Sequence, residues 1–305
     1  MKDSDPRKLI ISIDLDMWWH CRWATGGVNS IWPDTQSLLS DYYGHEAPGN
    51  ELVEYSENVL YLLDNYKVKA TFFVLGEVAT YFPALIKKIH DNGHEIACHG
   101  WNHIDATILG KEKFAEQVKR AKTLLEDLTG QPVLGYRAPN LVLAPWIFEE
   151  IDKAGFIYDS SICPSRKFFG KYADYEGFSN NPFLLPVSPQ DTNSTKIAEI
   201  PIPVMPYFKL PACSGIITRI LGAWWTNTAL RLVLQKGDAM YYFHPYEIGE
   251  RPILLQESLY LKIFLRNIGD SYTKMLHSIL GRQDSSSFSL AKDVAINLHN
   301  DSVSR

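Results

Sequence analysis

The stretch LIISIDLD, residues 9–16, begins with five mostly apolar residues and ends with two aspartates that are separated by one position. Its length and its β-branched side chains are typical of a buried strand. Six further runs of strand length follow it: ATFFVL (70–75), EIAC (95–98), VLGY (133–136), FIY (156–158), IAEIPI (197–202) and MYYF (240–243).

Between these runs, apolar residues recur at intervals of three and four, which predicts amphipathic helices. The predicted helices cover residues 50–66, 81–93, 111–130 and 145–155. Because strands and helices alternate, the sequence predicts an α/β fold with a parallel sheet. The chain of 305 residues fits one large domain with an appendage.

Ionisable side chains follow five of the predicted strands directly: Asp14 and Asp16, His99 and His103, Arg137, Asp159, and His244. In a parallel β/α barrel the carboxyl ends of all strands open onto one face, where residues that are distant in sequence meet. The sequence therefore predicts one pocket that gathers these side chains. His94 and Glu95, at the start of a strand, are interpreted as structural.

The pair His99 and His103 suggests a metal site. Imidazole binds zinc and similar ions, and a carboxylate from Asp14 or Asp16 would complete three protein ligands with an open position. Histidine pairs at this spacing are also common without a metal. The neighbouring carboxylates at a strand end favour the metal site over an incidental pair.

Five ordered motifs, SIDLD, HGWNH, YRAPN, YDSSI and YFHPYE, resemble those of the polysaccharide deacetylases, the NodB-homology family of carbohydrate esterases. HEIACHGWNH, GQPVLGYRAPN and FHPYEIGERP resemble the branch that is associated with bacterial exopolysaccharide and O-antigen assembly. The similarity covers roughly residues 8 to 250. It implies a deformed (β/α) barrel of about seven parallel strands and metal-dependent removal of an N-acyl group from an amino sugar.

The resemblance implies a role for each residue that matches a motif. Asp16, His99 and His103 match the metal ligands, and Asp14 matches the general base. A divalent ion lowers the pKa of a water that it binds to about 7 in the best-known zinc sites. Arg137 would pair with Asp14 and keep it ionised. Zinc is the metal expected, with nickel, cobalt or iron as alternatives.

His244 matches the general acid of the family, which protonates the departing amine. Asp159 would orient His244 or support its charge, although a turn with the two following serines explains Asp159 as well. A backbone N–H near Asn140 would face the oxyanion. Asn140 stands where the commonest family pattern has tyrosine, which puts side-chain contacts to the sugar in doubt.

Residues 17–49 form a predicted loop that is unusually long and rich in aromatic residues. Trp18 and Trp19, together with Trp101, are predicted to contact the sugar, because aromatic faces stack on sugar rings. An insertion that packs as a lid or as a dimer contact explains the same loop residues.

Composition excludes some partners and locations. The 30 basic residues are dispersed among 35 acidic ones, so no nucleic-acid partner is expected. The four separated cysteines indicate reduced thiols, and the run before Asp14 is too short for a signal peptide, so a cytoplasmic protein is expected. Arg219 and Arg231 disfavour a membrane span over residues 215–234, but a helix on a membrane surface is an alternative.

Together these features predict a two-part chain: a deacetylase barrel over residues 1–250 and a helical C-terminal extension over 251–305, packed on the barrel or partly mobile. The predicted function is metal-dependent removal of an N-acyl group, acetyl first, from an amino sugar in bacterial surface polysaccharide or lipopolysaccharide O-antigen synthesis. The sugar would be nucleotide-, lipid- or polymer-linked. The alternatives are hydrolysis of a non-sugar amide, and a catalytically silent glycan-binding or scaffold protein.

Overall fold

The computed structural model describes residues 7–27, 29–45, 47–166, 175–187, 196–254 and 258–303. Its centre is strand β1 (Leu9–Leu15), in which every residue is buried. Parallel strands pair with β1 on both sides, and side chains cover both of its faces. Its residues are therefore apolar in succession and do not alternate with polar ones.

In the described part of the chain, seven neighbouring strands form the parallel path of the sheet, and all seven overlap runs that were predicted from the sequence. In spatial order they are β10 (Ala239–Phe243), β1, β2 (Thr71–Val74), β3 (Glu95–Cys98), β4 (Gly135–Tyr136), β5 (Tyr158–Asp159) and β7 (Lys196–Glu199). Short strands were not predicted at β6 (Phe183–Pro186), which pairs antiparallel with β7, and at β11 (Phe288–Ser289), which pairs parallel with β1.

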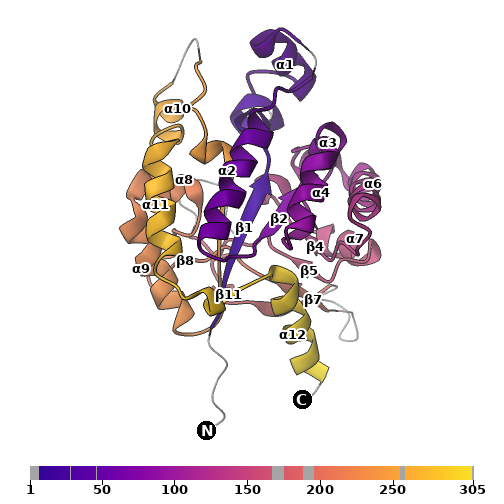
Figure 1. Ribbon diagram of the computed structural model, residues 1–305. Helices are drawn as coiled ribbons and strands as arrows, with labels where there is room; N and C mark the ends of the chain where they lie inside the picture. The colour runs from indigo at the N-terminus through magenta and orange to yellow at the C-terminus, as the bar shows by residue number, and fades with distance from the viewer. Residues whose placement is uncertain are drawn as a thin grey trace.

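The sheet curls so that its two ends approach each other. Beyond a small hairpin of β8 (Val204–Met205) and β9 (Leu210–Pro211), the chain returns to β10, where the Tyr242 N–H donates to the Cys213 carbonyl. The result is the deformed (β/α) barrel that was predicted, with helices outside the strands (Figure 1).

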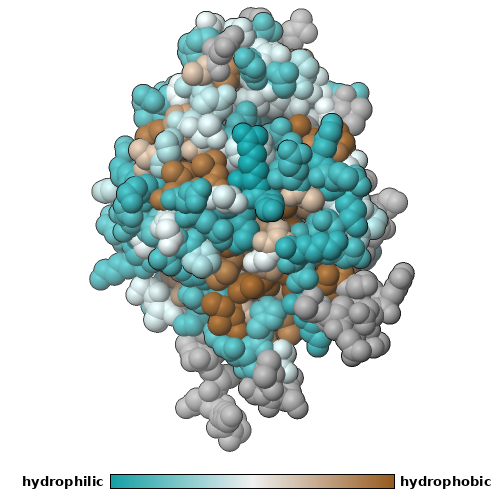
Figure 2. All heavy atoms as spheres, turned by 90° about the vertical axis from the view of Figure 1, so that its right-hand side faces the viewer, coloured by the Kyte–Doolittle hydropathy of each residue, from teal (hydrophilic) through white to brown (hydrophobic). Residues whose placement is uncertain are grey.

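Helices flank the sheet on both sides in Figure 1. The first group consists of α1 (Thr35–Tyr43), α2 (Glu51–Asn65), α3 (Gly76–Tyr81), α4 (Pro83–Asp91), α5 (Ala106–Leu109), α6 (Lys111–Thr129) and α7 (Ile147–Lys153). Among these, α2, α4, α6 and α7 are the four helices predicted from periodicity. Figure 2 shows the face formed by α6 and its neighbours, which is largely hydrophilic with smaller apolar areas.

The later helices are α8 (Gly215–Leu221), α9 (Ala223–Leu234), α10 (Leu259–Phe264), α11 (Asp270–Leu280) and α12 (Ala291–Val303). Helix α11 buries Tyr272 and Leu276 in the main core, and α12 packs along β7 and β6. Within the described ranges every helix is too short or too polar to cross a bilayer. The domain boundary at residue 250 stays a prediction, and residues 255–257 and 304–305 of the extension lie outside the described residues.

Candidate active site

The register of the parallel strands brings the predicted site residues to one edge. Cα partners pair Val74 with Cys98, Cys98 with Tyr136, and Tyr136 with Asp159, so these strands end at the same level. On the other side Ile13 pairs with Phe243. The residues that follow the strands therefore surround a common space.

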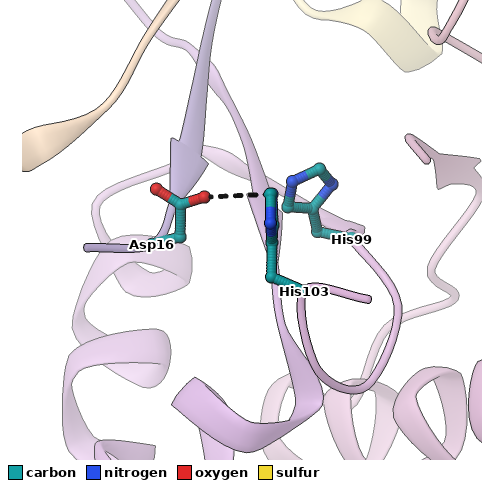
Figure 3. Close-up of side chains that lie close together, drawn as sticks. All are labelled: Asp16, His99 and His103. Atoms are coloured by element: carbon teal, nitrogen blue, oxygen red, sulfur yellow. Dashed lines mark ion pairs between the residues drawn. The ribbon is translucent and has the colours of Figure 1, made fainter. Parts of the chain in front are cut away.

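Asp16, His99 and His103 lie together at this edge, and one potential ligand atom from each lies within 4.8 Å of the others (Figure 3). The His103 Nε2 atom is 3.3 Å from Asp16 Oδ2. Gly100, at φ 87°, provides the left-handed turn that lets both histidines face the aspartate. All three residues are buried.

The second ring nitrogen of His99 is fixed by the backbone. Nδ1 donates a hydrogen bond of 2.9 Å to the Arg137 carbonyl, which leaves Nε2 as the electron-pair donor of the neutral ring. Among the described residues, neither His99 Nε2 nor Asp16 Oδ1 has a hydrogen-bond partner. Buried polar atoms without partners are rare in proteins, and both of these belong to residues of the Asp16, His99 and His103 cluster.

The ionisation of these groups fits a cation. Burial lowers the pKa of His99 to about 4, so the ring is neutral, as a metal ligand must be. Burial also raises the pKa of Asp16 to about 7, because desolvation outweighs the opposing charges of His244 and His20. One carboxylate and two imidazoles are the donor set that zinc and its neighbours accept, so these residues fit one divalent ion.

Asp14 lies beside this group but has a different partner. The Arg137 guanidinium donates to Asp14 Oδ1 at 2.5 Å, and Oδ2 lies 3.8 Å from His99 Nε2 and 4.0 Å from His244 Nε2. Burial alone would raise the pKa of Asp14, but the charge of Arg137, with that of His244, holds this pKa below its usual value. Asp14 is therefore a carboxylate that stays ionised.

Arg137 is itself completely buried and is satisfied by hydrogen bonds. Its Nε donates to the Ser160 carbonyl at 2.9 Å, and its Nη2 donates to the hydroxyls of Ser12 and Ser160. The guanidinium therefore has a fixed position, and it fixes Asp14 in turn.

The partner of His244 is Glu247, and sequence reasoning missed it. Glu247 Oε2 accepts from the His244 backbone N–H at 3.0 Å and lies 3.4 Å from the ring Nδ1. Glu247 is in turn paired with the buried Arg219, whose Nε lies 3.0 Å from Oε1. The only signal in the sequence is the spacing of three residues in HPYE; nothing local indicates that Arg219 joins it.

Burial would lower the pKa of His244, but the negative charges of Asp16 and Glu247 raise this pKa to about 9. The imidazole is therefore protonated at neutral pH and able to donate a proton from Nε2. Its Nε2 lies 4.0 Å from Asp14 Oδ2, so a proton donor and a carboxylate are neighbours in the lining of one cavity.

The predicted role of Asp159 in supporting His244 is wrong. Asp159 accepts from the backbone N–H and the hydroxyl of Ser161, at 2.9 and 2.8 Å, and burial raises its pKa although hydrogen bonds with Glu199 and Ser161 oppose the rise. The alternative reading of Asp159 as a turn former with its serines describes this contact. The error arose because a strand-end position shows that a residue is near the pocket but not which way it points.

The predicted tryptophan contacts also need correction. Trp18 and Trp19 are only 3% and 2% exposed and pack inside the aromatic cluster of the loop, where Trp18 stacks on Trp23. Trp101 lies under the Arg120 guanidinium, 3.5 Å from its ring centroid. None of the three predicted tryptophans lines the cavity at the site, whereas Trp23 does. The loop buries Trp18 and Trp19 and half-buries its other tryptophans and tyrosines, because these rings pack on one another.

A cavity of about 630 Å³ opens above the site. Asp14, Asp16, His103 and His244 line one end of it, and Asn140 lines the same cavity, as predicted for a substrate contact. The Asn140 side chain donates to Asp105 at 2.8 Å, and its backbone adopts φ 56°. The oxyanion contact near Asn140 stays a prediction.

Comparison with known proteins shows which families the sequence of this chain resembles. A family model described as polysaccharide deacetylase matches residues 45–158, and a model described as a domain of unknown function (DUF3473) matches residues 160–292. The chain is 31% identical over 157 residues to the peptidoglycan deacetylase-like protein FGM2 of Gibberella zeae, which covers 51% of this chain and 44% of that protein.

A peptidoglycan-N-acetylglucosamine deacetylase of Bacillus cereus is 31% identical over 126 residues, or 38% of this chain and 59% of the relative. The chain thus spans about half the length of these curated relatives.

Solved structures share the fold across nearly the whole chain. A Mycobacterium smegmatis protein, whose assignment to the polysaccharide deacetylases is provisional, has a TM-score of 0.66 at 17% identity and covers 99% of this chain and 94% of its own. A CE4 family pseudoenzyme from Bacillus anthracis has a TM-score of 0.51 at 12% identity, covering 95% and 66%. The chain is thus similar to the polysaccharide deacetylases over residues 45–158, and it shares the fold of these solved structures.

Proposed function

We propose that this chain is a metal-dependent N-deacetylase that hydrolyses the N-acyl group, acetyl first, of an amino sugar. The observation that carries the proposal is the position of Asp14, whose Oδ2 lies 3.8 Å from His99 of the metal-ligand cluster and 4.0 Å from the His244 Nε2. A glycan-binding protein has no need of a buried base and a buried acid beside a metal-ligand set. The curated relatives that are named as peptidoglycan deacetylases support the same chemistry.

In this mechanism Asp16, His99 and His103 hold one divalent ion, for which zinc is proposed first. The bound ion supplies Lewis-acid chemistry, polarising the acyl carbonyl and acidifying water. Asp14, held ionised by Arg137, takes a proton from the attacking water as its oxygen bonds to the carbonyl carbon. His244 donates its Nε2 proton to the amide nitrogen as the C–N bond breaks, which yields acetate and a free amine.

Glu247 and Arg219 act on this step through His244. Glu247 raises the pKa of the imidazole and orients it, while Arg219 keeps Glu247 ionised in a buried setting. The finer biological role, in bacterial exopolysaccharide or O-antigen synthesis in the cytoplasm, is part of the proposal and rests on the sequence motifs alone.

The test is release of acetate or formate from a panel of N-acylated sugars that includes N-acetylglucosamine oligomers, peptidoglycan fragments and nucleotide- and lipid-linked sugars. The metal-loaded chain is expected to release acetate from at least one of them, and Asp14→Asn is the matched inactive control. Linear and cyclic non-sugar amides in the same panel test the alternative amide hydrolase. A metal-loaded chain that binds glycan but releases no acid from any substrate would contradict the proposal in favour of a silent binding protein.

A further inference from the structure

The cavity at the active site has two unlike ends. One end carries the ionisable groups described above. The opposite wall comes from α8 and α10, and the side chains it presents are apolar except for one tyrosine hydroxyl: Ile216, Ile217, Ile220, Leu221, Tyr260, Ile263 and Phe264. A typical ligand pocket combines a few polar groups with an apolar lining, but a sugar polymer would leave its hydroxyls without partners along this wall.

The wall is firmly built. On the face of α8 away from the cavity, the buried Arg219 guanidinium donates to the Phe264 and Arg266 carbonyls at 2.6 and 2.7 Å and pairs with Glu247. The same Glu247 holds His244. The side chain that ties α8 to the α10 segment is therefore also tied to the general acid, which sets the apolar wall at a fixed position relative to the chemistry.

The apolar lining continues to the outer surface instead of ending inside the molecule. Leu221, Ile263 and Tyr260 line the cavity and are 43%, 46% and 60% exposed, and Leu259 and Trp224 beside them are 75% and 66% exposed. An exposed group of large apolar side chains at a cavity mouth is typical of a surface that meets lipid or another apolar body.

We propose that the substrate is a lipid-linked amino sugar, whose N-acyl group lies at Asp14 and His244 and whose hydrocarbon carrier lies along the wall of α8 and α10. The proposal rests on the proposed deacetylase function. An occupant that runs from the catalytic carboxylates to the mouth must be attached to the amide that is cleaved. Because the apolar lining reaches the surface, a hydrocarbon that follows it leaves the cavity through the mouth. The carrier of a membrane-resident substrate is long enough to do so, whereas a short N-acyl group is not.

The test compares three N-acyl glucosaminides at concentrations below micelle formation: methyl N-acetyl, octyl N-acetyl, and methyl N-octanoyl. For the metal-loaded full chain, kcat/KM for acid release is expected to be roughly tenfold or more higher with the octyl than with the methyl N-acetyl compound, since each buried methylene favours binding. The N-octanoyl compound is expected to show no gain. Equal kcat/KM values for the two N-acetyl compounds, or a gain only with the N-octanoyl chain, would overturn the proposal.

Variants locate the effect on the wall. Ile217→Asp and Ile220→Asp, at half-buried positions on α8, are expected to bring the ratio of kcat/KM for the octyl and methyl N-acetyl compounds close to one. Tyr61→Asp, an exposed position on α2, is the matched control and is expected to keep the gain. An octyl gain that survives both α8 substitutions would contradict the assignment of the wall.

Calorimetric binding of the octyl and methyl N-acetyl compounds separates this proposal from the deacetylase proposal. If neither compound releases acetate, preferential binding of the octyl compound that is lost in Ile217→Asp still supports the hydrocarbon site, and the proposed reaction alone fails. Equal binding of the two compounds with acetate release intact would reject the hydrocarbon site and leave the deacetylase in place.

Discussion

Two buried polar clusters lie at opposite ends of the same strands. At the amino ends, Glu95 accepts hydrogen bonds from the Thr71 hydroxyl, the Tyr158 hydroxyl and the Lys292 backbone N–H, so both of its oxygens are satisfied. At the carboxyl ends, Asp16 Oδ1 and His99 Nε2 have no such partner in the described part of the chain. Burial of polar groups alone therefore does not mark a functional site. A group of potential metal-ligand atoms without hydrogen-bond partners does.

The cluster around Glu95 at the amino ends, the lower cluster, has a structural role, in contrast to the upper cluster of Asp16, His99 and His103 at the carboxyl ends. Through Glu95 and Thr71 it fastens the start of α12, because the Ala291 and Lys292 backbone N–H groups donate to these two side chains. The C-terminal segment is thereby tied to the amino ends of β2 and β3. The interpretation of Glu95 as structural agrees with these contacts.

The largest effect is expected where the upper cluster loses a metal ligand. Asp16→Ala or His99→Ala is expected to lower kcat/KM for acetate release about 10⁴-fold or more, because several kcal/mol of charge stabilisation and the activated water are lost together. Steady-state kinetics with added metal measures the change. Near-native turnover by either variant would show that the cluster of Asp16, His99 and His103 is not needed for catalysis.

Asp14→Asn is expected to lower kcat roughly 10³-fold while the metal stays bound, because a general base contributes about 10²–10⁴-fold. Metal analysis of the purified variant, together with its kcat, checks both halves of this outcome. Loss of the metal from Asp14→Asn would show instead that Asp14 is a ligand.

A smaller effect is expected at Glu247, which touches His244 but not the metal-ligand set. Glu247→Gln removes a negative charge that raises the pKa of His244, so this pKa falls. Since the general acid must be protonated, activity is lost as pH rises through its pKa, and the alkaline limb of the pH–rate profile is expected to move to lower pH. At pH 7 kcat is expected to fall roughly tenfold, a typical cost of losing a group that orients a site residue. An unchanged alkaline limb would show that Glu247 only supports the fold.

The smallest effect on activity is expected at the lower cluster. Glu95→Gln is expected to leave kcat/KM within about twofold and to lower the free energy of unfolding by about 1–3 kcal/mol, because buried hydrogen bonds are weakened. Denaturant titration and acetate release, measured on the same preparation, check the two values. A loss of activity without a loss of stability would contradict the contrast between the clusters.

The strands could be predicted from the sequence because each overlaps an apolar run of strand length, and ionisable residues directly follow five of the seven runs. That Asp14, Asp16, His99 and His103 lie close together could be predicted because parallel strands end on one face, whereas their separate roles came from the resemblance to a family. The Arg219–Glu247 pair could not, because it joins residues 28 positions apart through packing of α8. The direction of Asp159 and of the loop tryptophans also depends on tertiary packing, which local pattern does not encode.

Metal binding by the upper cluster is the most direct test of the account. The chelator-treated full chain, titrated with zinc or cobalt by calorimetry, is expected to bind close to one ion per chain. Asp16→Ala is expected to lose this binding, and Glu95→Gln to keep it. Absence of binding by the unsubstituted chain, or the same stoichiometry and affinity in Asp16→Ala, would contradict the central claim that Asp16, His99 and His103 form a metal centre.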